Sequence, residues 1–296
     1  MLTVLKILHT VITIVMLVPG SALNSFIISF YITRSKNKQR LTTCEQIVLS
    51  TAVSDLLLQW FSAFINLMYY VISRLPQIGI LYLYLSVFYF CMSYFFFWNT
   101  AWLSIQYCLK LFNFSNHWWT WVKVQFKSSM KLILMASLIW VFAVSFPVYG
   151  TVSLVIDSTT NFTSPVINYY CLTVNIFLGC VLPFISTLIC ISLSVMYLIR
   201  HVWRIKESNF SSSRVGGHVR AIRSMVLQVV LNTMLQMAIT GTIATAFNLT
   251  SFSLQDVFRV FSMLSIATYP SVEALTLIIG NPTLKKRLWR KLEVFC

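Results

Sequence analysis

The stretch Trp98–Ser115, WNTAWLSIQYCLKLFNFS, decides how the rest of the chain is organised. It begins deep inside an apolar segment that opens near Ile80, and it ends in a basic loop that is rich in tryptophan. An apolar run that turns basic at its end is typical of a helix with a membrane-buried half and a foot in water. The stretch therefore predicts a long membrane helix at this point of the chain.

Composition indicates the same solvent for the whole chain. Of its 296 residues 58% are hydrophobic and only 10% are charged, which is too little charge for the surface of a soluble domain. The net charge of +15 would favour nucleic acid if the basic residues formed one face of a soluble domain. They lie instead in short loops between apolar runs, so we expect the lipid bilayer as a partner and no nucleic acid.

Seven apolar stretches are long enough to span a bilayer, which takes about 20 helical residues. They cover residues 8–32, 47–72, 80–109, 131–153, 174–199, 224–247 and 258–280, and a short basic tail follows at 281–296. The first stretch is too long for a cleaved signal peptide, and its basic cluster follows it rather than precedes it. The predicted fold class is an all-α membrane protein, a seven-transmembrane helix bundle in a single domain over residues 1–296.

Lysine and arginine residues indicate the orientation of the bundle. Of the 22, all but Lys6, Arg74 and Arg259 lie in the segments that follow spans 1, 3, 5 and 7. Cytoplasmic loops are enriched in these residues, so we expect those segments in the cytoplasm. This predicts a multi-pass protein of the plasma membrane with an extracellular N-terminus and a cytoplasmic C-terminus.

Glycosylation sequons offer a test of this orientation. Asn161 and Asn248 begin sequons in loops on the expected outer side, and we expect these two sites to be modified. The sequons at Asn113 and Asn209 lie on the expected cytoplasmic side, so they should stay bare.

The sequence shows no recognisable catalytic or metal-binding motif. It contains no HExxH, no GxSxG and no Gly-rich phosphate loop, and its seven cysteines lack metal-ligand spacing. Two carboxylates inside the spans, Asp55 and Glu273, raise the alternative of an aspartyl protease, but no Gly-rich catalytic sequence surrounds them. A channel or transporter would need a ring of pore-facing charge, and two acids make a poor ring. We expect no enzyme, no metal and no cofactor.

The Trp98–Ser115 stretch resembles the third transmembrane helix and following loop of the type 2 (bitter) taste receptors, a family of G-protein-coupled receptors. The residues in register are Trp98, Leu103, Ser104, Tyr107, Leu109, Lys110, Asn113, Phe114 and Ser115. Other spans also match, as with Leu182-Pro183-Phe184 in span 5 and Tyr269-Pro270-Ser271 in span 7. The resemblance implies a receptor that senses small, mainly apolar (bitter) molecules and activates a heterotrimeric, gustducin-like G protein.

Three positions depart from the pattern of that family. Position 55, usually Arg, is Asp; position 273, in the family's His-Ser pair, is Glu; and Asn281 is followed by Pro282. These departures suggest a divergent branch. They leave open a type 1 vomeronasal-like chemosensory receptor and, less favoured, a small membrane transporter.

A receptor ligand should enter the outer half of the bundle, between the helices. The resemblance maps pocket positions to Asn66, Tyr89 and Ser93, and Gln236, Thr240 and Met263 lie at similar depth. Tyr89 and Ser93 are four residues apart and so share one helix face. The alternative for each residue is an ordinary polar contact between helices.

Basic residues at the inner ends of the spans form a second candidate site. Lys110, His201, Arg204, His218, Arg223 and Lys285 could line a cavity for the C-terminal helix of a G-protein α subunit. The alternative is that these positive charges only set the topology.

Three polar residues of spans 1, 2 and 7 are expected at one depth. At 1.5 Å per residue, Asn24, Asp55 and Glu273 lie roughly 12–14 Å from the inner ends of their spans. Two bare carboxylates there would cost several kcal/mol, and no Lys or Arg within the spans neutralises them. A shared proton, or a cation beside Asn24, would relieve that cost. We expect a polar switch that links the three spans; the alternative is that each acid has a separate polar partner.

Overall fold

A computed structural model describes residues 2–72, 79–112, 117–150, 153–156, 163–166, 169–207, 212–246 and 252–295. Most of these residues are helical. The helices are α1 (Leu2–Lys36), α2 (Thr43–Ile72), α3 (Gly79–Leu111), α4 (His117–Ser128), α5 (Met130–Gly150), α6 (Tyr169–Ile176), α7 (Leu182–Glu207), α8 (Ser212–Ala246), α9 (Phe252–Gly280) and α10 (Pro282–Phe295). A π-helical turn, Phe177–Val181, joins α6 to α7, and two short strands, β1 (Ser153–Ile156) and β2 (Thr163–Val166), form an antiparallel hairpin.

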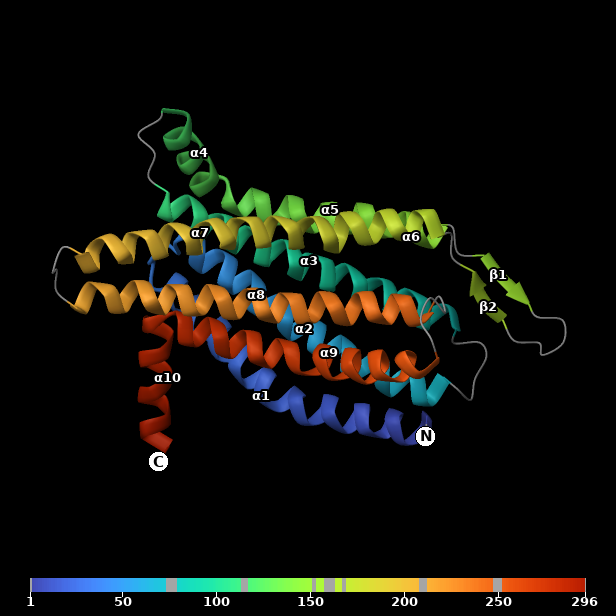
Figure 1. Ribbon diagram of the computed structural model, residues 1–296. Helices are drawn as coiled ribbons and strands as arrows, with labels where there is room; N and C mark the ends of the chain where they lie inside the picture. The colour runs from blue at the N-terminus through green and yellow to red at the C-terminus, as the bar shows by residue number, and fades with distance from the viewer. Residues whose placement is uncertain are drawn as a thin grey trace.

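The long helices lie side by side in one elongated bundle (Figure 1). Helix α1 packs against α2 and α9, α2 against α3, α3 against α5 and α7, α7 against α8, and α8 against α9. Helices α1, α2, α3, α7, α8 and α9 thus close a ring, and α5 packs on its outside against α3. The N-terminus and the C-terminus lie at opposite ends of the bundle, and the hairpin projects from the end that holds the N-terminus (Figure 1).

Polarity is distributed in the reverse of a soluble protein. Large apolar side chains are exposed along the outer faces, as with Val18 at 70% and Phe146 at 76%. Polar side chains are buried between the helices; Asn24, Asp55, Asn99, Asn232 and Glu273 are each no more than 1% exposed. Such an arrangement suits a lipid solvent, in which polar groups bond across the bundle. Five helical segments of the described chain are long and apolar enough to cross a membrane: Thr10–Lys36, Thr43–Ile65, Met130–Pro147, Tyr170–Arg200 and Val260–Gly280.

The end of α1 and the start of α2 are held together by a capping box and an ion pair. The Thr42 amide donates to Glu45 Oε2 at 2.8 Å, and the Glu45 amide donates to Thr42 Oγ1 at 3.4 Å, so this Thr-x-x-Glu sequence begins α2. Glu45 also pairs with Arg34 near the end of α1. The short connection between the two helices is therefore fixed from both sides.

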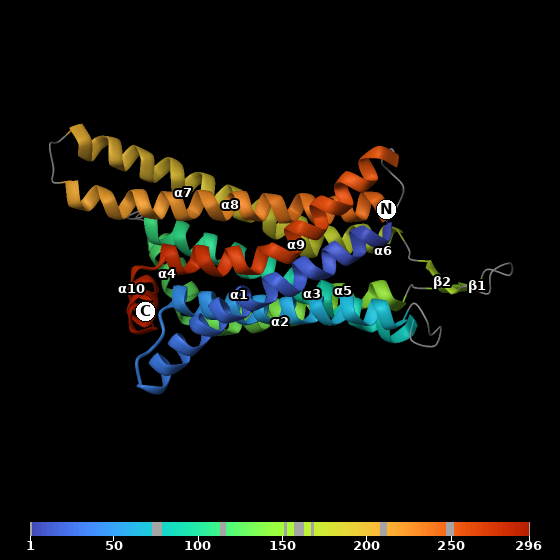
Figure 2. The same ribbon diagram turned by 90° about the horizontal axis from the view of Figure 1, so that it is seen from below.

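Helix α10 begins at an Asn-Pro signal and lies across the end of the bundle (Figures 1 and 2). Asn281 Oδ1 accepts the amides of Thr283 at 3.0 Å and Leu284 at 3.4 Å, and Pro282 occupies the first helical position. Asn281 Nδ2 donates to the Tyr31 hydroxyl of α1 at 3.0 Å. The Leu284 side chain is fully buried in the core beside α1 and α2. These contacts fix α10 against α1.

Two features differ from the sequence expectation. Residues 117–128, expected as a loop, form the helix α4, whose Trp118 and Trp121 are exposed and whose Trp119 indole donates to Phe112 O at 2.8 Å. Tryptophan and lysine at helical spacing suit the membrane–water interface, which explains a helix there. The stretch 131–153, expected as a span, runs past the end of α5 at Gly150 and reaches the first residue of β1. Several other helices extend beyond the expected spans, because a helix need not end where its apolar run ends.

Candidate functional site

A cavity of about 110 Å³ lies between α2, α3, α8 and α9. Its lining is mostly apolar with a few polar groups, which is typical of a small-molecule pocket. The lining residues are Asp55, Leu58, Tyr89, Phe90, Ser93, Phe96, Leu235, Ile239, Ile266, Tyr269 and Pro270. The cavity lies toward the end of the bundle that holds the N-terminus, because α3 begins at that end and Tyr89 lies ten residues from its start (Figure 1).

Tyr89 and Ser93 both line the cavity from one face of α3, as their spacing predicts. The Ser93 hydroxyl donates to the Tyr89 carbonyl at 2.9 Å within the same helix, and Ser93 is 6% exposed. Its proton is therefore used inside the helix, while its lone pairs stay available to accept a hydrogen bond. Of the predicted ligand-binding residues, these two are the ones that the cavity brings together.

The prediction for α8 needs correction. The cavity face of this helix carries Leu235 and Ile239, not Gln236 and Thr240. Each step along a helix turns the side chain by about 100°, so the positions that follow point away from the cavity. Gln236 Oε1 accepts from the Cys180 thiol at 2.8 Å, and Thr240 is exposed on the outer surface. Asn66 and Met263 lie outside the residues whose side chains the structure describes.

Tyr269, at the floor of the cavity, contacts the buried carboxyl group of Glu273. The Tyr269 hydroxyl lies 2.6 Å from Glu273 Oε2 and 2.9 Å from Asn232 Oδ1, and Gln228 Nε2 donates to Glu273 Oε1 at 2.6 Å. Glu273 is fully buried. These bonds join α8, which carries Gln228 and Asn232, to α9, which carries Tyr269 and Glu273. A contact at the cavity floor is therefore coupled to the α8–α9 interface.

The second acid, Asp55, lies near Glu273. The two carboxyl groups are close enough to interact electrostatically, and Asp55 is 1% exposed. Asp55 Oδ2 and Asn24 Oδ1 are buried with no hydrogen-bond partner among the described residues. Asn24 Nδ2 reaches the Pro270 carbonyl of α9 at 3.5 Å. The structure thus brings the three residues of the predicted switch into one buried layer between α1, α2 and α9.

The sequence analysis missed Gln228 and Asn232, the partners of this layer on α8. A signal for them was present, because Gln228, Asn232 and Gln236 recur every four residues within an apolar span. An amide inside a membrane helix needs a partner across the bundle. Where the structure describes side chains, no group of three or more His, Cys, Asp or Glu residues could hold a metal ion.

A π-helical turn widens the α6–α7 segment beside the cavity wall. Gly179 lies there with the Tyr94 ring of α3 packed where a Cβ would stand, and Cys180, the donor to Gln236, is fully buried next to it. Single π-helical turns occur frequently at functional sites, because they re-aim side chains within a helix. This one turns Cys180 toward α8.

The predicted coupling residues whose side chains the structure describes belong to the end of the bundle away from the N-terminus. Lys110, Arg223 and Lys285 are exposed. His201, Arg204 and His218 lie outside the residues whose side chains are described. Helices α7 and α8 project beyond the other helices at this end (Figures 1 and 2). The glycosylation candidates Asn161 and Asn248 also lie outside the described residues.

Comparison with known proteins gives one consistent result over the whole length. The profile of the family described as "Taste receptor protein (TAS2R)" matches residues 1–295. The chain is 28% identical to taste receptor type 2 member 43 of Papio hamadryas, over 97% of this chain and 94% of the relative. It is 26% identical to taste receptor type 2 member 31 of Gorilla gorilla gorilla, over 97% of this chain and 93% of the relative.

These matches extend the resemblance seen in the Trp98–Ser115 stretch over nearly the whole length of the chain, and they do not favour the vomeronasal-like and transporter alternatives. A receptor family also agrees with a multi-pass membrane protein that is not classed as an enzyme. The chain belongs to the taste receptor type 2 (TAS2R) family of G-protein-coupled bitter taste receptors.

Proposed function

We propose that the chain binds small, mainly apolar bitter agonists in the cavity between α2, α3, α8 and α9 and activates a gustducin-like heterotrimeric G protein. One observation carries this proposal: Tyr269 lines the cavity, and its hydroxyl lies within hydrogen-bonding distance of both Asn232 on α8 and Glu273 on α9. An agonist that touches Tyr269 changes the interface between these two helices. A binding event in the cavity can therefore alter the inner ends of α8 and α9.

The size of the cavity indicates how an agonist acts. Ligand pockets usually measure about 300–1,000 Å³, and this one measures about 110 Å³. An agonist must therefore favour a wider arrangement of α3, α8 and α9 over the one described. Binding energy that differs between the two arrangements shifts the population toward the wider one, which is all that an agonist needs to do.

The proposed topology has seven spans with the N-terminus outside and the C-terminus in the cytoplasm of a plasma-membrane receptor. The termini lie at opposite ends of the bundle, which supports an odd number of crossings (Figure 1). The elements that flank the Asn161 and Asn248 sequons, β1 with β2 and α8 with α9, meet at the N-terminal end. The basic helix α10 lies at the other end, in agreement with a cytoplasmic location.

The proposed G-protein site is the inner end of the bundle, where α7 and α8 project past the other helices (Figure 2). Outward movement of α8 relative to α3 would open a cavity there. The residues proposed to line it are Lys110, His201, Arg204, His218, Arg223 and Lys285.

We also propose that Asp55 and Glu273 form a switch that biases the inactive bundle. The two buried carboxyl groups interact, and Asp55 Oδ2 and Asn24 Oδ1 lack partners among the described residues. A shared proton or a small cation held beside Asn24 would neutralise part of the buried charge. Loss of that neutralising proton or cation would loosen the contact between α1, α2 and α9.

The test of function is expression with a promiscuous G-protein subunit and a calcium readout across a panel of bitter compounds. We expect at least one compound to give a concentration-dependent signal that needs the G protein. A receptor that reaches the cell surface and stays silent to every compound, or that passes current or solute without G protein, would contradict the proposal.

Topology is tested separately. A tag at residue 1 should be accessible on intact cells, while a tag after Cys296 should need permeabilisation. Glycosidase should shift the mass of the wild type but not that of the Asn161→Gln, Asn248→Gln double variant. Modification at Asn113 or Asn209 would mean that the orientation is inverted.

A further inference from the structure

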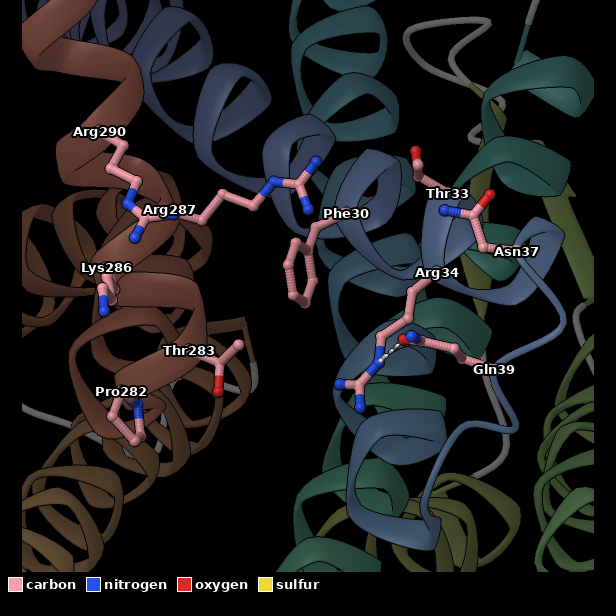
Figure 3. Close-up of a pocket in the computed structure, with 10 residues that line it drawn as sticks. All are labelled: Phe30, Thr33, Arg34, Asn37, Gln39, Pro282, Thr283, Lys286, Arg287 and Arg290. Atoms are coloured by element: carbon pink, nitrogen blue, oxygen red, sulfur yellow. Dashed lines mark hydrogen bonds between the residues drawn. The ribbon is translucent and has the colours of Figure 1, made fainter.

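A wide groove separates the inner end of α1 from α10. It measures about 1130 Å³, roughly ten times the volume of the cavity near Tyr89. Figure 3 shows its two walls: Phe30, Thr33 and Arg34 come from α1, with Asn37 just after it, and Lys286, Arg287 and Arg290 come from α10. Neither the receptor pocket nor the proposed coupling residues use this groove.

The groove is basic, and most of its charge is not neutralised. Arg34 is paired with Glu45 and also donates to Gln39 Oε1 at 3.0 Å. Lys286, Arg287 and Arg290 form no ion pair among the described residues, and all three are exposed. The Arg287 guanidinium lies 5.2 Å from the centre of the Phe30 ring, a cation–π contact that directs it across the groove. Three cations on one wall therefore face the groove without a counter-ion.

The basic wall is held in place rather than free to move away. Residues 286, 287 and 290 lie within one turn of α10, so their side chains project toward one side of the helix. Asn281 caps α10 and bonds Tyr31 of α1, while Leu284 is buried in the core. The distance between the two walls is thus set by contacts at the start of α10.

Both helices of the groove expose large apolar side chains next to groove residues in the sequence. Ile32 of α1, between two groove residues, is 43% exposed, and Trp289 of α10 is 57% exposed. A helix that lies across the end of a membrane bundle, with basic residues and an exposed tryptophan, is placed at the level of the lipid headgroups. In the proposed orientation these headgroups belong to the cytoplasmic leaflet, which is the anionic one.

We propose that this groove binds the headgroup of a phosphoinositide, a membrane lipid with several phosphates on one sugar-like ring. Each phosphomonoester carries about −1.5 to −2 charges, so two of them match the three unpaired cations of α10. Arginine binds phosphate oxygens in pairs through its planar fork, and lysine adds a point charge. A headgroup with a single net charge, such as that of phosphatidylserine, would leave most of these cations unpaired. A phosphoinositide bound here would bridge α1 and α10 from the lipid side.

The experiment measures binding of a fluorescent short-chain phosphatidylinositol 4,5-bisphosphate to the purified full-length receptor in detergent micelles. The test variant is Lys286→Gln, Arg287→Gln, Arg290→Gln. The control variant, Lys123→Gln, Lys127→Gln, Lys131→Gln, removes the same charge from α4 and α5. We expect affinity to fall roughly 100-fold in the test variant, at about tenfold or less per cation, and by no more than a few-fold in the control. Equal losses in both variants would mean unspecific charge attraction and would overturn the proposal.

Competition distinguishes the source of the phosphates. Phosphatidylserine at the same concentration should compete poorly, and soluble inositol 1,4,5-trisphosphate should compete more weakly than the lipid because it lacks acyl chains. If phosphatidylserine competes equally well, the groove is not a phosphoinositide site; if the soluble phosphate does, the ligand is not a lipid.

A single substitution keeps the proposal testable if the triple variant does not fold. Arg287→Lys keeps the charge and removes the fork, so it should weaken lipid binding several-fold without changing the thermal melting of the receptor. Unchanged affinity in a folded Arg287→Lys receptor would contradict the role given to the Arg287 fork. Binding in micelles does not depend on membrane orientation or on G-protein activation, so a failure of this proposal is separate from a failure of the proposed function.

Discussion

The two hollows of this bundle differ in almost every physical property. The cavity at Tyr89 is small, mostly apolar and enclosed by four helices, whereas the groove at Arg287 is ten times larger, basic and open beside α10. In both hollows, contacts with neighbouring helices fix the position of the helices that form the walls. Their different chemistry follows from depth: a site among membrane-buried helix faces selects neutral, apolar molecules, while a site at the headgroup level can hold phosphate. The two proposed sites therefore share no ligand chemistry.

The buried polar layer of Asn24, Asp55 and Glu273 adjoins the cavity, which Asp55 also lines. Gly20 supports this layer, because the side chains of Gln59 and Ser271 occupy the space in which its Cβ would lie. Gln59 and Ser271 both donate to the Met16 carbonyl, at 2.6 and 3.0 Å. The close approach of α1 to α2 and α9 therefore needs glycine at this position.

The most general expected effect, on the amount of folded receptor itself, comes from breaking this support. Gly20→Leu forces α1 away from both neighbours, and overpacking of this kind costs about 1–3 kcal/mol or more, so surface receptor should fall roughly tenfold. Ala22→Leu, two residues further on an exposed position, should leave the amount unchanged. Surface labelling of tagged receptor measures both; equal loss in the two variants would mean that the Gly20 contact is not special.

A more local effect, on agonist potency alone, is expected inside the cavity. Tyr89→Ala and Ser93→Ala each remove a side chain that lines it, and a buried contact is worth about 1–3 kcal/mol, or roughly 5- to 150-fold in agonist potency. Surface expression should be unchanged. Calcium responses over a concentration series give the potencies, and unchanged potency in both variants would place the agonist site elsewhere.

The interaction between Asp55 and Glu273 should make the effects of substituting them on basal signalling non-additive. Asp55→Asn and Glu273→Gln should each raise or abolish basal signalling, and their combined effect should differ from the sum by about 0.5–3 kcal/mol. The physical reason is that the two buried carboxyl groups are close enough to interact electrostatically. Basal G-protein activation per surface receptor is the measurement for the four-variant cycle, and strictly additive effects would contradict the switch.

The sequence predicts best where a single helix contains the whole signal. The shared face of Tyr89 and Ser93 follows from helical periodicity alone, and both line the cavity. Depth in the membrane predicts Thr240 as a pocket residue, but depth does not give the rotation of α8 about its axis, and the Thr240 side chain is exposed. The hydrogen bonds of Glu273 involve Gln228 on α8 and Tyr269 on α9. The position of Glu273 within its own span does not predict which residue of another span it contacts.

The basic groove was out of reach of sequence reasoning for the same reason. Its walls are separated by some 250 residues in the chain, and the charges of α10 alone indicate only the cytoplasmic side. The Asn281–Tyr31 hydrogen bond, between residues 250 positions apart, brings the walls together.

The most direct test of the agonist site uses one substitution at two adjacent positions of α8. Ile239→Trp fills the cavity, whereas Thr240→Trp places the same ring on the exposed face. Calcium dose–response curves, at matched surface expression, should show the agonist signal lost in Ile239→Trp and retained in Thr240→Trp. Retention in Ile239→Trp, or equal loss in both variants, would contradict the conclusion that agonists bind between α2, α3, α8 and α9.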